Sequence, residues 1–431
     1  MPIAAQLLDV ALFWSMERYG DLSIHAVLDV RRRFTRAELE RAFEKTIADF
    51  PVLGCRYEIG VLRDRWVEAS DSISNAVHVR EDVVDGDAVE ATTLEWVRKP
   101  IVATVERPFR VVSLARASGS RLLLSVLHIA VDGAGVAAVG HVFGSHLYGV
   151  APLAPADRRR DVRSTLDRLG LVHLPVLARD VARASMIPLK TLLTTRRRKA
   201  YDVSPTAHCE HRDLVITKAE LDALRARFSP VPSINDLLVA GLSRAVAQRS
   251  HWGPATVLYT MDLRRFAAAP RLTAANVSTI LTAHVPREAT GDLETAVRAV
   301  QSITSTHRSS LIGPGFLVVP HLLGLLSPPP LLRRLLPYLH PLLVDGPLDR
   351  GLFVTNVGRV DDGLRAFDAD LESLRILGPL IAGTAVPGIV AFGFRGSLHL
   401  QIISPPHLGA GAAAELEREV RAALELPAPS A

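Results

Sequence analysis

The order of secondary structure is easiest to read between residues 109 and 148, FRVVSLARASGSRLLLSVLHIAVDGAGVAAVGHVFGSHLY. Two apolar runs, 109–117 and 121–127, flank a Ser-Gly-Ser sequence and predict a β-hairpin. The second strand runs into His128, and a helix rich in glycine, alanine and valine is predicted from Gly133 to about Tyr148. The residues HIAVDG, 128–133, therefore join a buried strand to a helix.

The rest of the first half also alternates strands and helices. A strand is predicted at 22–30, and Thr35 with Glu38 forms a capping box that starts a helix. The remaining elements predicted here are two short strands and a helix, at 54–58, 65–69 and 87–98.

After the middle of the chain the same kind of sequence returns. Thr217 with Glu220 forms a second capping box, and further helices are predicted at 233–248 and 410–425. Strands are predicted at 209–216, 255–261, 278–285, 352–357, 386–394 and 398–403. These elements predict an α/β (α+β) fold of two related halves, each a largely antiparallel mixed sheet with flanking helices. We place the first half at 1–175, a linker at 176–205 and the second half at 206–431.

Length and composition bound the class of protein. A chain of 431 residues has room for two or three domains, or for one large domain with an internal duplication. With 48% hydrophobic and 22% charged residues, a disordered or fibrous chain is excluded. The net charge of +5 and the 5% of aromatic residues disfavour nucleic acid as a partner. Cys55 and Cys209 are isolated, which argues against disulfides and a cysteine-based zinc site and fits a reducing compartment.

The sequence shows no convincing targeting signal. Its first twenty residues lack a basic start and place Asp9 inside their apolar run. Residues 311–330 carry no charge, but glycine and proline interrupt them and would break a helix in lipid. We therefore expect a cytoplasmic protein.

The residues of HIAVDG are of the types that acid–base chemistry needs. A histidine at the end of a strand is held by the sheet and exchanges protons near neutral pH, so His128 is a candidate general base. Asp132 could orient the imidazole or pair with an arginine. Gly133 permits a close approach of the backbone before a helix whose amide groups favour negative charge. These roles suit acyl transfer, but a purely structural hydrogen bond between the histidine and the aspartate fits the spacing equally well.

Other chemistries have less support. A metal site would need a third ligand beside His128 and Asp132, and no further cluster supplies one, so no metal is predicted. GxSxG, P-loop and strand-associated GxGxxG patterns are also missing from the sequence. Hydrolase, nucleotide-binding and Rossmann interpretations therefore lose their usual motifs.

HIAVDG resembles the HxxxDG signature of the superfamily of nonribosomal-peptide condensation domains, plant BAHD acyltransferases, wax ester synthases and phthiocerol dimycocerosyl transferases. Weaker similarities follow in the same order along most of the chain, at PVLGCR (51–56), SINDLL (233–238), MDLR (261–264), ANV (275–277) and TNVGR (355–359). The resemblance implies two chloramphenicol-acetyltransferase-like halves with the active site at their interface.

The resemblance also implies roles for the matching residues. His128 is the base that deprotonates an acceptor hydroxyl or amine, which then attacks an acyl thioester. Asp132 and Gly133 are structural, with Arg264 as the first choice for the partner of the Asp132 carboxylate and Arg56 as the second.

Two asparagines and three departures refine this comparison. The resemblance implies that Asn276 and Asn356 shape the tunnel floor or donate hydrogen bonds, although asparagines that satisfy only local backbone are at least as common. Ala275 replaces the usual glycine, Leu127 replaces the first histidine of the double-histidine form, and no DFGWG string occurs. These departures favour the stand-alone lipid or polyketide branch.

We therefore predict an acyltransferase that moves an acyl group from a thioester to a hydroxyl acceptor. The co-substrate is acyl-CoA or a phosphopantetheinyl carrier protein, and no bound cofactor is expected. A thioester expels thiolate readily, so one base suffices. An amide-forming condensation enzyme and a non-catalytic module that binds a carrier protein or a lipid remain alternatives. We expect a monomer.

Three further features have both a functional and a plain interpretation. The apolar, proline-rich residues 311–343 could line an acyl tunnel or contact a membrane surface peripherally, or form an irregular crossover on the core. The basic clusters 158–160 and 196–199 could dock an acidic carrier protein or the phosphates of coenzyme A, or simply be solvated. Four other histidines are interpreted as structural or surface residues: His141, His146, His208 and His211.

Overall fold

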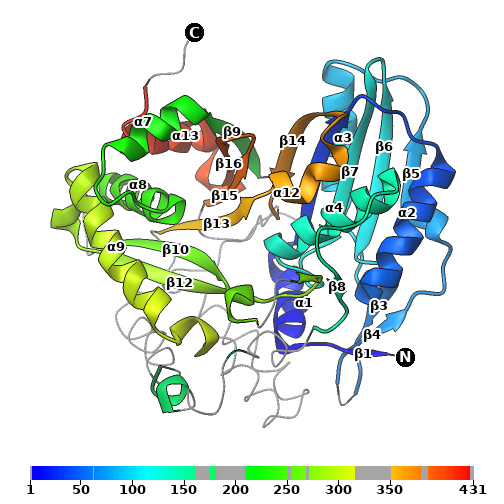
Figure 1. Cartoon of the computed structure of the whole chain (residues 1–431), viewed down its shortest axis with the longest axis horizontal. Helices are drawn as coiled ribbons and strands as arrows, with labels where there is room; N and C mark the ends of the chain where they lie inside the picture. Colours follow the sequence, from blue (N-terminus) through cyan, green and yellow to red (C-terminus); the bar gives the residue numbers. More distant parts are fainter. Residues whose placement is uncertain are drawn as a thin grey trace.

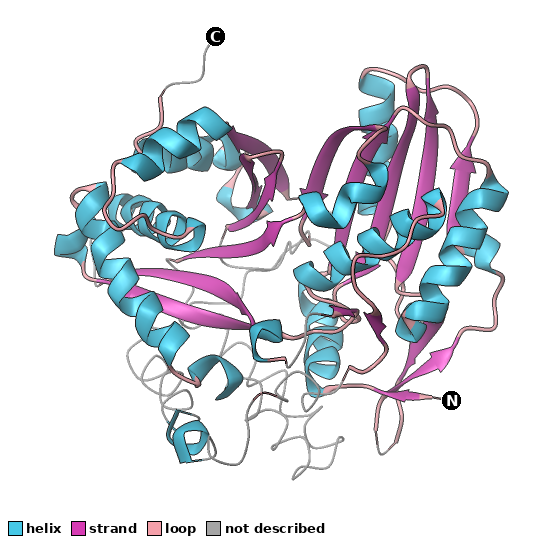
Figure 2. Ribbon diagram, viewed as in Figure 1, coloured by secondary structure: helices cyan, strands magenta, loops and turns pink. Residues whose placement is uncertain are grey.

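Two β-sheets with flanking helices form two lobes that lie next to each other in the computed structural model (Figures 1 and 2). The structure describes residues 2–61, 63–160, 168, 175–180, 182, 209–249, 254–267, 271–315, 351–379 and 387–427. The predicted α/β fold with two largely antiparallel mixed sheets is confirmed. The predicted linker lies outside the described residues apart from 176–180 and 182, so its boundaries stay a prediction.

The first lobe is built on a five-stranded sheet with the order β14-β2-β7-β6-β5. Its strands are β2 (Ser23–Val30), β5 (Val77–Arg80), β6 (Phe109–Arg116), β7 (Gly119–Leu127) and β14 (Leu371–Leu377). All neighbours pair antiparallel except β5 and β6. The predicted hairpin of β6 and β7 is confirmed, with Phe109 opposite Val126.

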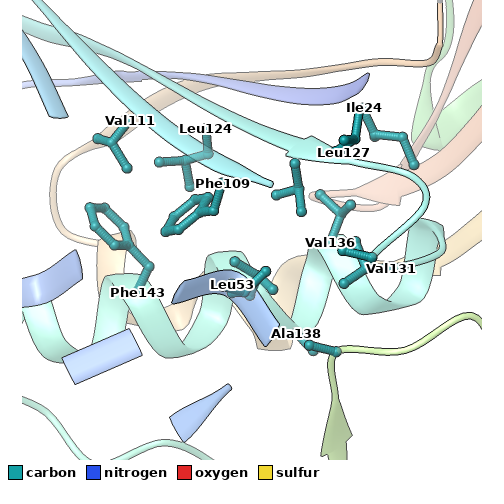
Figure 3. Close-up of a cluster of buried hydrophobic side chains, with 14 of the residues drawn as sticks. Ile24, Leu53, Phe109, Val111, Leu124, Leu127, Val131, Val136, Ala138 and Phe143 are labelled. Atoms are coloured by element: carbon teal, nitrogen blue, oxygen red, sulfur yellow. The ribbon is translucent and has the colours of Figure 1, made fainter. Parts of the chain in front are cut away.

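Helices cover both faces of this sheet. Helices α2 (Arg36–Asp49) and α4 (Gly133–Tyr148) pack on one face, and α3 (Asp87–Arg98) packs on the other. The predicted capping box of α2 is present, because Thr35 and Glu38 each accept a hydrogen bond from the other's amide group. Figure 3 shows the core beneath α4, which includes Phe109, Leu124, Leu127, Val136 and Phe143. This packing holds the start of α4 against the end of β7.

The second lobe is built on a six-stranded sheet with the order β12-β10-β13-β15-β16-β9. Its strands are β9 (Glu210–Ile216), β10 (Ala255–Asp262), β12 (Ser278–Val285), β13 (Leu352–Arg359), β15 (Gly388–Phe394) and β16 (Ser397–Ser404). Strand β13 pairs parallel with both of its neighbours, and the other pairs are antiparallel. All six strands were predicted, with small differences at their ends.

The helices of the second lobe are α7 (Lys218–Ala226), α8 (Ile234–Arg249), α9 (Leu293–Ser309) and α13 (Ala412–Ala423). The predicted capping box at Thr217 and Glu220 starts α7. Apolar residues of α8, α9 and α13 share one core with Ile389 and Ala391 of β15. The alternate residues of that strand, Val390 and Phe392, belong to the core of the first lobe. Because successive strand residues face opposite ways, the second sheet contributes to both cores.

Strand β14 comes from the second half of the chain but completes the sheet of the first lobe (Figure 1). It pairs antiparallel with β2 and places Leu377 opposite His25. Before it, α12 (Asp361–Leu364) and a turn of 3-10 helix pack on α4. There the ring of Phe367 lies against Gly144, where a Cβ atom would come within 2.2 Å of the ring. The two lobes are thus joined by pairing as well as by packing.

Of the smaller elements, the pair β8–β11 and helix α1 link the two lobes, whereas a further small sheet belongs to the first lobe alone. Strands β1 (Ile3–Ala4), β4 (Arg65–Glu68) and β3 (Cys55–Glu58) form a three-stranded sheet, and β8 (Ala156–Asp157) pairs with β11 (Leu272–Thr273). Helix α1 (Leu7–Tyr19) contacts both cores, with Phe13 in the first and Leu8 against the second. Four elements were not predicted from the sequence: α1, α9, β5 and β14.

None of the helices in the described ranges combines the length and the hydropathy needed to cross a membrane. Of residues 311–343, only 311–315 are described. The three interpretations of that segment therefore stay predictions.

Candidate active site between the lobes

His128 follows β7 directly, where the first sheet meets the start of α4. Its amide donates to the carbonyl of Leu22 at 3.1 Å. The next three residues, 129–131, are fully buried, whereas His128 is partly exposed. The Nδ1 atom of His128 is buried and has no hydrogen-bond partner within the described part of the chain. The exposed part of this residue therefore does not include Nδ1, which leaves Nε2 as the candidate nitrogen for proton transfer.

Asp132 is almost fully buried, and hydrogen bonds to both of its carboxylate oxygens fix its position. It is the N-cap of α4, where its Oδ1 accepts from the amide of Gly135 at 2.8 Å. Its Oδ2 accepts from the amide of Val277 at 2.9 Å, and the guanidinium of Arg264 donates to both oxygens at 2.9 and 3.1 Å. Burial alone would raise the pKa of Asp132, but Arg264 and the amide donors outweigh it and lower that pKa. Asp132 is therefore ionised, and both of its carboxylate oxygens accept hydrogen bonds from Arg264 and from backbone amides, not from the imidazole of His128.

Arg264 ties Asp132 to the second lobe. It lies in the 3-10 turn that follows β10, and it also donates to the side chain of Thr273 at 2.8 Å and to the carbonyl of Ala275 at 3.1 Å. The amide of Asp132 donates to the same Ala275 carbonyl at 3.3 Å. The predicted contact between Asp132 and Arg264 is thus present, and it joins residues 132 positions apart across the two lobes.

Arg56, the second choice, does not contact Asp132. Its guanidinium lies 3.6 Å from the carboxylate of Glu58 and 3.5 Å from the carbonyl of Thr104. That interpretation was wrong, because β3 carries its own acidic partner for this arginine two residues away.

The two predicted asparagines have different partners, and only Asn276 contacts the turn formed by residues 128–132. Asn276 donates to the carbonyl of Ile129 at 3.0 Å, next to His128 in the chain. Asn356 donates to the side chain of Asn235 at 2.6 Å and accepts from the amide of Gly358 at 2.9 Å. Asn276 therefore stabilises the backbone next to His128. Asn356 stabilises β13 where its pairing with β15 is irregular.

Gly133 is the first residue of α4 and lies against β13. A Cβ atom on it would come within 3.3 Å of the side chain of Val357. The close approach of the second lobe to the start of the helix therefore leaves little room for a side chain here, and Gly133 does not have a left-handed backbone.

A second buried ion pair, which the sequence analysis missed, supports the same turn. The guanidinium of Arg160 donates to both carboxylate oxygens of Asp9 at 2.9 and 3.2 Å, and neither side chain is more than 4% exposed. Arg160 also donates to the carbonyl of Ala130 at 2.7 Å and to that of Ala274 at 3.0 Å. The only sequence signal was a lone aspartate in an apolar run, which we had used as an argument against a targeting signal.

This pair also changes the interpretation of the basic cluster 158–160. Arg160 is buried, and Arg159 forms an ion pair with Asp157 at 2.9 Å. Two of the three arginines are therefore engaged within the protein. The cluster 196–199 lies outside the described residues.

The other histidines have structural surroundings where they are described. His141 lies between the carbonyl of Gly363 at 2.8 Å and the amide of Leu153 at 2.9 Å. His146 contacts Asp49 at 2.7 Å. Burial lowers the pKa of His211 to about 4. His208 lies outside the described residues.

In the part of the chain that the structure describes, no group of three or more histidine, cysteine, aspartate or glutamate side chains is arranged to hold a metal ion. The two cysteines are buried, and burial raises the pKa of both thiols, that of Cys209 to about 11. Neither is therefore set up as a thiolate nucleophile.

Known proteins resemble this chain in structure and not detectably in sequence. No family model and no curated protein matches it. Trichothecene 15-O-acetyltransferase TRI3 of Fusarium sporotrichioides has a TM-score of 0.73 at 11% identity, with 98% of this chain and 95% of that chain covered. The first condensation domain of the CDA synthetase has a TM-score of 0.67 at 17% identity, with 99% and 96% covered.

Polyketide synthase associated protein 5 of Mycobacterium tuberculosis is also similar, with a TM-score of 0.64 at 15% identity and 98% of each chain covered. All three likenesses extend over nearly the whole chain. They show that the chain has the two-lobed fold of condensation domains, which confirms the resemblance inferred from HIAVDG at the level of the fold.

Proposed function

We propose that this chain, with its condensation-domain fold, is an acyltransferase that moves an acyl group from a thioester to a hydroxyl group, with His128 as general base. The observation that carries the proposal is the setting of His128. Its ring is partly exposed, on a turn whose other residues are buried and whose Asp132 is locked by Arg264. This arrangement keeps a base in one place and leaves one ring edge accessible to a substrate.

In the proposed reaction Nε2 of His128 takes the proton of the acceptor hydroxyl as its oxygen attacks the thioester carbonyl carbon. The new C–O bond forms and the carbonyl oxygen becomes an oxyanion. When this intermediate collapses, the C–S bond breaks and the thiolate leaves. The imidazolium returns its proton to the thiolate, so the enzyme is regenerated and an ester and a free thiol are the products.

The start of α4 supports this chemistry electrostatically. The first amide groups of a helix have no acceptor within the helix and favour negative charge. Asp132 uses the amide of Gly135, so the amides of Gly133 and Ala134 are the donors we assign to the oxyanion.

The state of the two cysteines is consistent with direct transfer of the acyl group from the thioester to the acceptor. Cys55 and Cys209 are buried with raised pKa values, so neither favours a covalent acyl-enzyme. A thioester needs little acid assistance because thiolate is a good leaving group, so one histidine suffices. We propose acyl-CoA or an acyl carrier protein as the donor. An oxygen acceptor is favoured because the structure neighbour TRI3 is described as an O-acetyltransferase.

The test is turnover of acyl-CoA and acyl carrier protein thioesters with panels of alcohols and amines, followed by mass spectrometry of the products. We expect ester formation by the wild-type protein and a loss of about 10²- to 10⁴-fold in His128→Ala. His146→Ala, which removes another partly exposed histidine, is the matched control and should keep wild-type turnover.

Two outcomes would overturn the proposal. Amide products alone would assign the enzyme to peptide-type condensation. Binding of a thioester by the wild-type protein and by His128→Ala alike, with no product from either, would assign a carrier- or lipid-binding module.

A further inference from the structure

We infer that Arg160, paired with Asp9 and assisted by Asn276, is a positioning residue for His128, distinct from the Asp132–Arg264 pair. The part of this inference that concerns catalysis rests on the proposed function. The geometric part concerns the turn 128–132 itself and can be tested without any substrate.

The polar groups of the turn are divided between the two ion pairs. On one side, the amide and the carboxylate of Asp132 bond to Ala275, Val277 and Arg264. On the other side, the carbonyl of Ala130 accepts from Arg160 at 2.7 Å, and the carbonyl of Ile129 accepts from Asn276 at 3.0 Å. The carbonyls nearest to His128 are therefore held by Arg160 and Asn276, not by Arg264.

These carbonyl groups have no alternative partner in water. Ile129 and Ala130 are fully buried, so losing the donors would leave buried acceptors unsatisfied, which is costly. The turn would then relax to recover hydrogen bonds. Because His128 directly precedes Ile129, such a change moves the imidazole.

Asp9 makes Arg160 and Asn276 act together. Its carboxylate, which is fully buried, also accepts from the side chains of Trp66 at 3.0 Å and of Asn276 at 3.4 Å. Asp9 lies on α1, which contacts both cores, whereas Arg160 follows β8 and Asn276 precedes β12. One carboxylate thus sets the position of both donors relative to the two lobes.

The orientation of the Asn276 amide follows from its neighbours. Both groups that its nitrogen contacts, the Ile129 carbonyl and the Asp9 carboxylate, are acceptors. The nitrogen must therefore face the turn, and Oδ1 points elsewhere, buried and without a partner among the described residues. This assignment leaves Asn276 as a donor to the turn.

The closing experiment separates positioning from stability. Arg160→Met removes the donor to the Ala130 carbonyl and leaves Asp9 buried without its main partner. Asp9→Asn together with Arg160→Met removes both charges and should recover much of the lost stability, since an unpaired buried charge is the costly species. In both variants the Ala130 carbonyl lacks its donor.

We expect kcat to fall about 100-fold in both variants, with KM within about threefold of the wild-type value, because misplacing a catalytic group by about 1 Å has effects of this size. The matched control is Asp29→Asn with Arg121→Met, which removes another buried aspartate–arginine pair. Arg121 lies six residues before Leu127 on β7, or about 20 Å away at the usual rise per residue. This control should keep the wild-type kcat. If kcat recovers together with stability in the Asp9→Asn, Arg160→Met variant, the pair is merely structural and the inference is wrong.

A second arm needs no substrate. The ring signals of histidine-labelled protein, assigned with His128→Ala, should give one narrow set for His128 in the wild-type protein and in the control variant. They should broaden or double in the Asp9→Asn, Arg160→Met variant. Unchanged signals would contradict the inference. A changed signal in a protein that shows no acyl transfer would instead keep the inference and refute the proposed function.

Discussion

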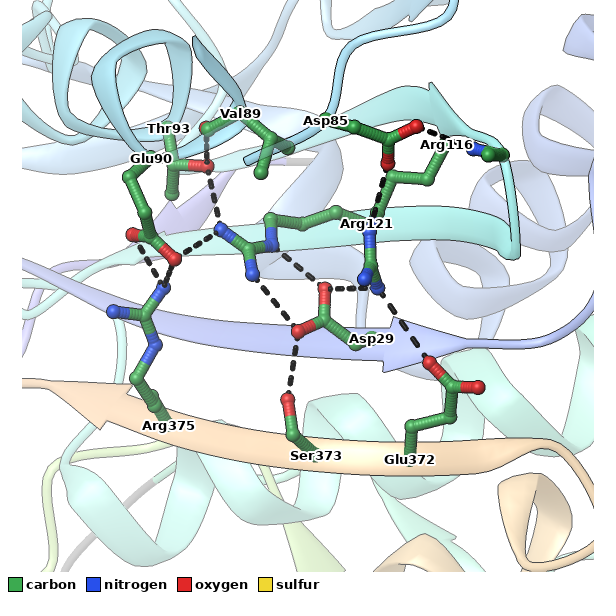
Figure 4. A network of polar contacts seen from close by, with 11 residues as sticks. Asp29, Asp85, Val89, Glu90, Thr93, Arg116, Arg121, Glu372, Ser373 and Arg375 are labelled. Atoms are coloured by element: carbon green, nitrogen blue, oxygen red, sulfur yellow. Dashed lines mark hydrogen bonds and ion pairs between the residues drawn. The ribbon is translucent and has the colours of Figure 1, made fainter. Parts of the chain in front are cut away.

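Buried aspartate–arginine pairs lie near both ends of strand β7, but the pairs at the two ends hold different parts of the molecule. At the start of the strand, Arg121 donates to both oxygens of Asp29 at 2.7 and 2.8 Å and to Glu90 at 2.7 Å (Figure 4). The same carboxylates accept from Ser373 and Arg375 of β14. This network joins side chains to side chains and fastens β14 and α3 to the sheet.

Beyond the far end of β7, the two pairs Asp132–Arg264 and Asp9–Arg160 bind backbone groups. Arg264 and Arg160 each donate to backbone carbonyls as well as to an aspartate. Asp132 also accepts from two backbone amides. The comparison indicates that buried charges at the start of β7 serve the fold, whereas those at its end determine the shape of one turn. That turn is the one that leaves His128 partly exposed.

The largest expected effect comes from comparing Arg264→Met with Arg121→Met. Each variant removes an arginine from a buried aspartate, and Asp29 keeps a second arginine, Arg116, at 3.0 Å. Breaking a buried pair costs about 3–5 kcal/mol, so the loss in Arg121→Met should be the smaller one. We expect both variants to have a lower free energy of unfolding, measured in urea, with the larger decrease in Arg264→Met. Only Arg264→Met should also lower turnover, by at least about 10²-fold, because Asp132 then loses its tie to the second lobe.

An equal loss of turnover in Arg121→Met would contradict this division between fold and turn. Turnover should be measured well below the denaturation midpoint of each variant, so that the fraction of folded protein is the same in both.

A buried histidine next to the last residues of β7 offers a test by pH. His25 of β2 contacts Ser125 of β7 at 2.8 Å, and burial, with Arg110 and His211 adding to it, lowers the pKa of His25 from 6.5 to about 3. The unfolded chain takes up this proton near pH 6.5 and the folded chain does not. Stability is therefore full above pH 6.5 and falls as the pH drops toward 3, by about 3 kcal/mol at pH 4.

His25→Gln keeps a side chain that can bond to Ser125 but does not titrate. We expect the free energy of unfolding of this variant to depend less steeply on pH between 6.5 and 4, by about 1.4 kcal/mol per pH unit. Parallel curves for the two proteins would show that burial of His25 does not have the assigned effect.

The smallest expected effect is that of Ser373→Ala. The Ser373 hydroxyl donates to Asp29 at 2.7 Å, and Asp29 keeps Arg121 when this bond is lost. We expect a decrease of about 1 kcal/mol in the free energy of unfolding and unchanged turnover. A change in turnover would mean that the network of β14 and the turn of His128 are coupled.

Much of the fold could be predicted because its signals are local. The hairpin of β6 and β7 follows from two apolar runs around a short turn, and both capping boxes need only residues three positions apart. HIAVDG likewise lies between two elements that are adjacent in the chain. Such patterns are set by backbone geometry over a few residues.

The missed features depend on distant partners. Strand β14 completes a sheet whose neighbouring strand, β2, lies near the other end of the chain. Asp9 and Arg160 are 151 residues apart. A carboxylate can pair with any of many arginines, which is why Arg264 and Arg56 both remained candidates for Asp132.

The sequence by itself determined the strand, the turn and the helix around His128, since hydrophobic periodicity and capping act between near neighbours. Only the tertiary structure decided which arginine meets Asp132, that Asp9 and Arg160 support the same turn, and that β14 crosses to the first lobe. The physical reason is that an ion pair or a strand pair forms wherever packing brings two segments together. The distance between those segments in space is not encoded in any local pattern.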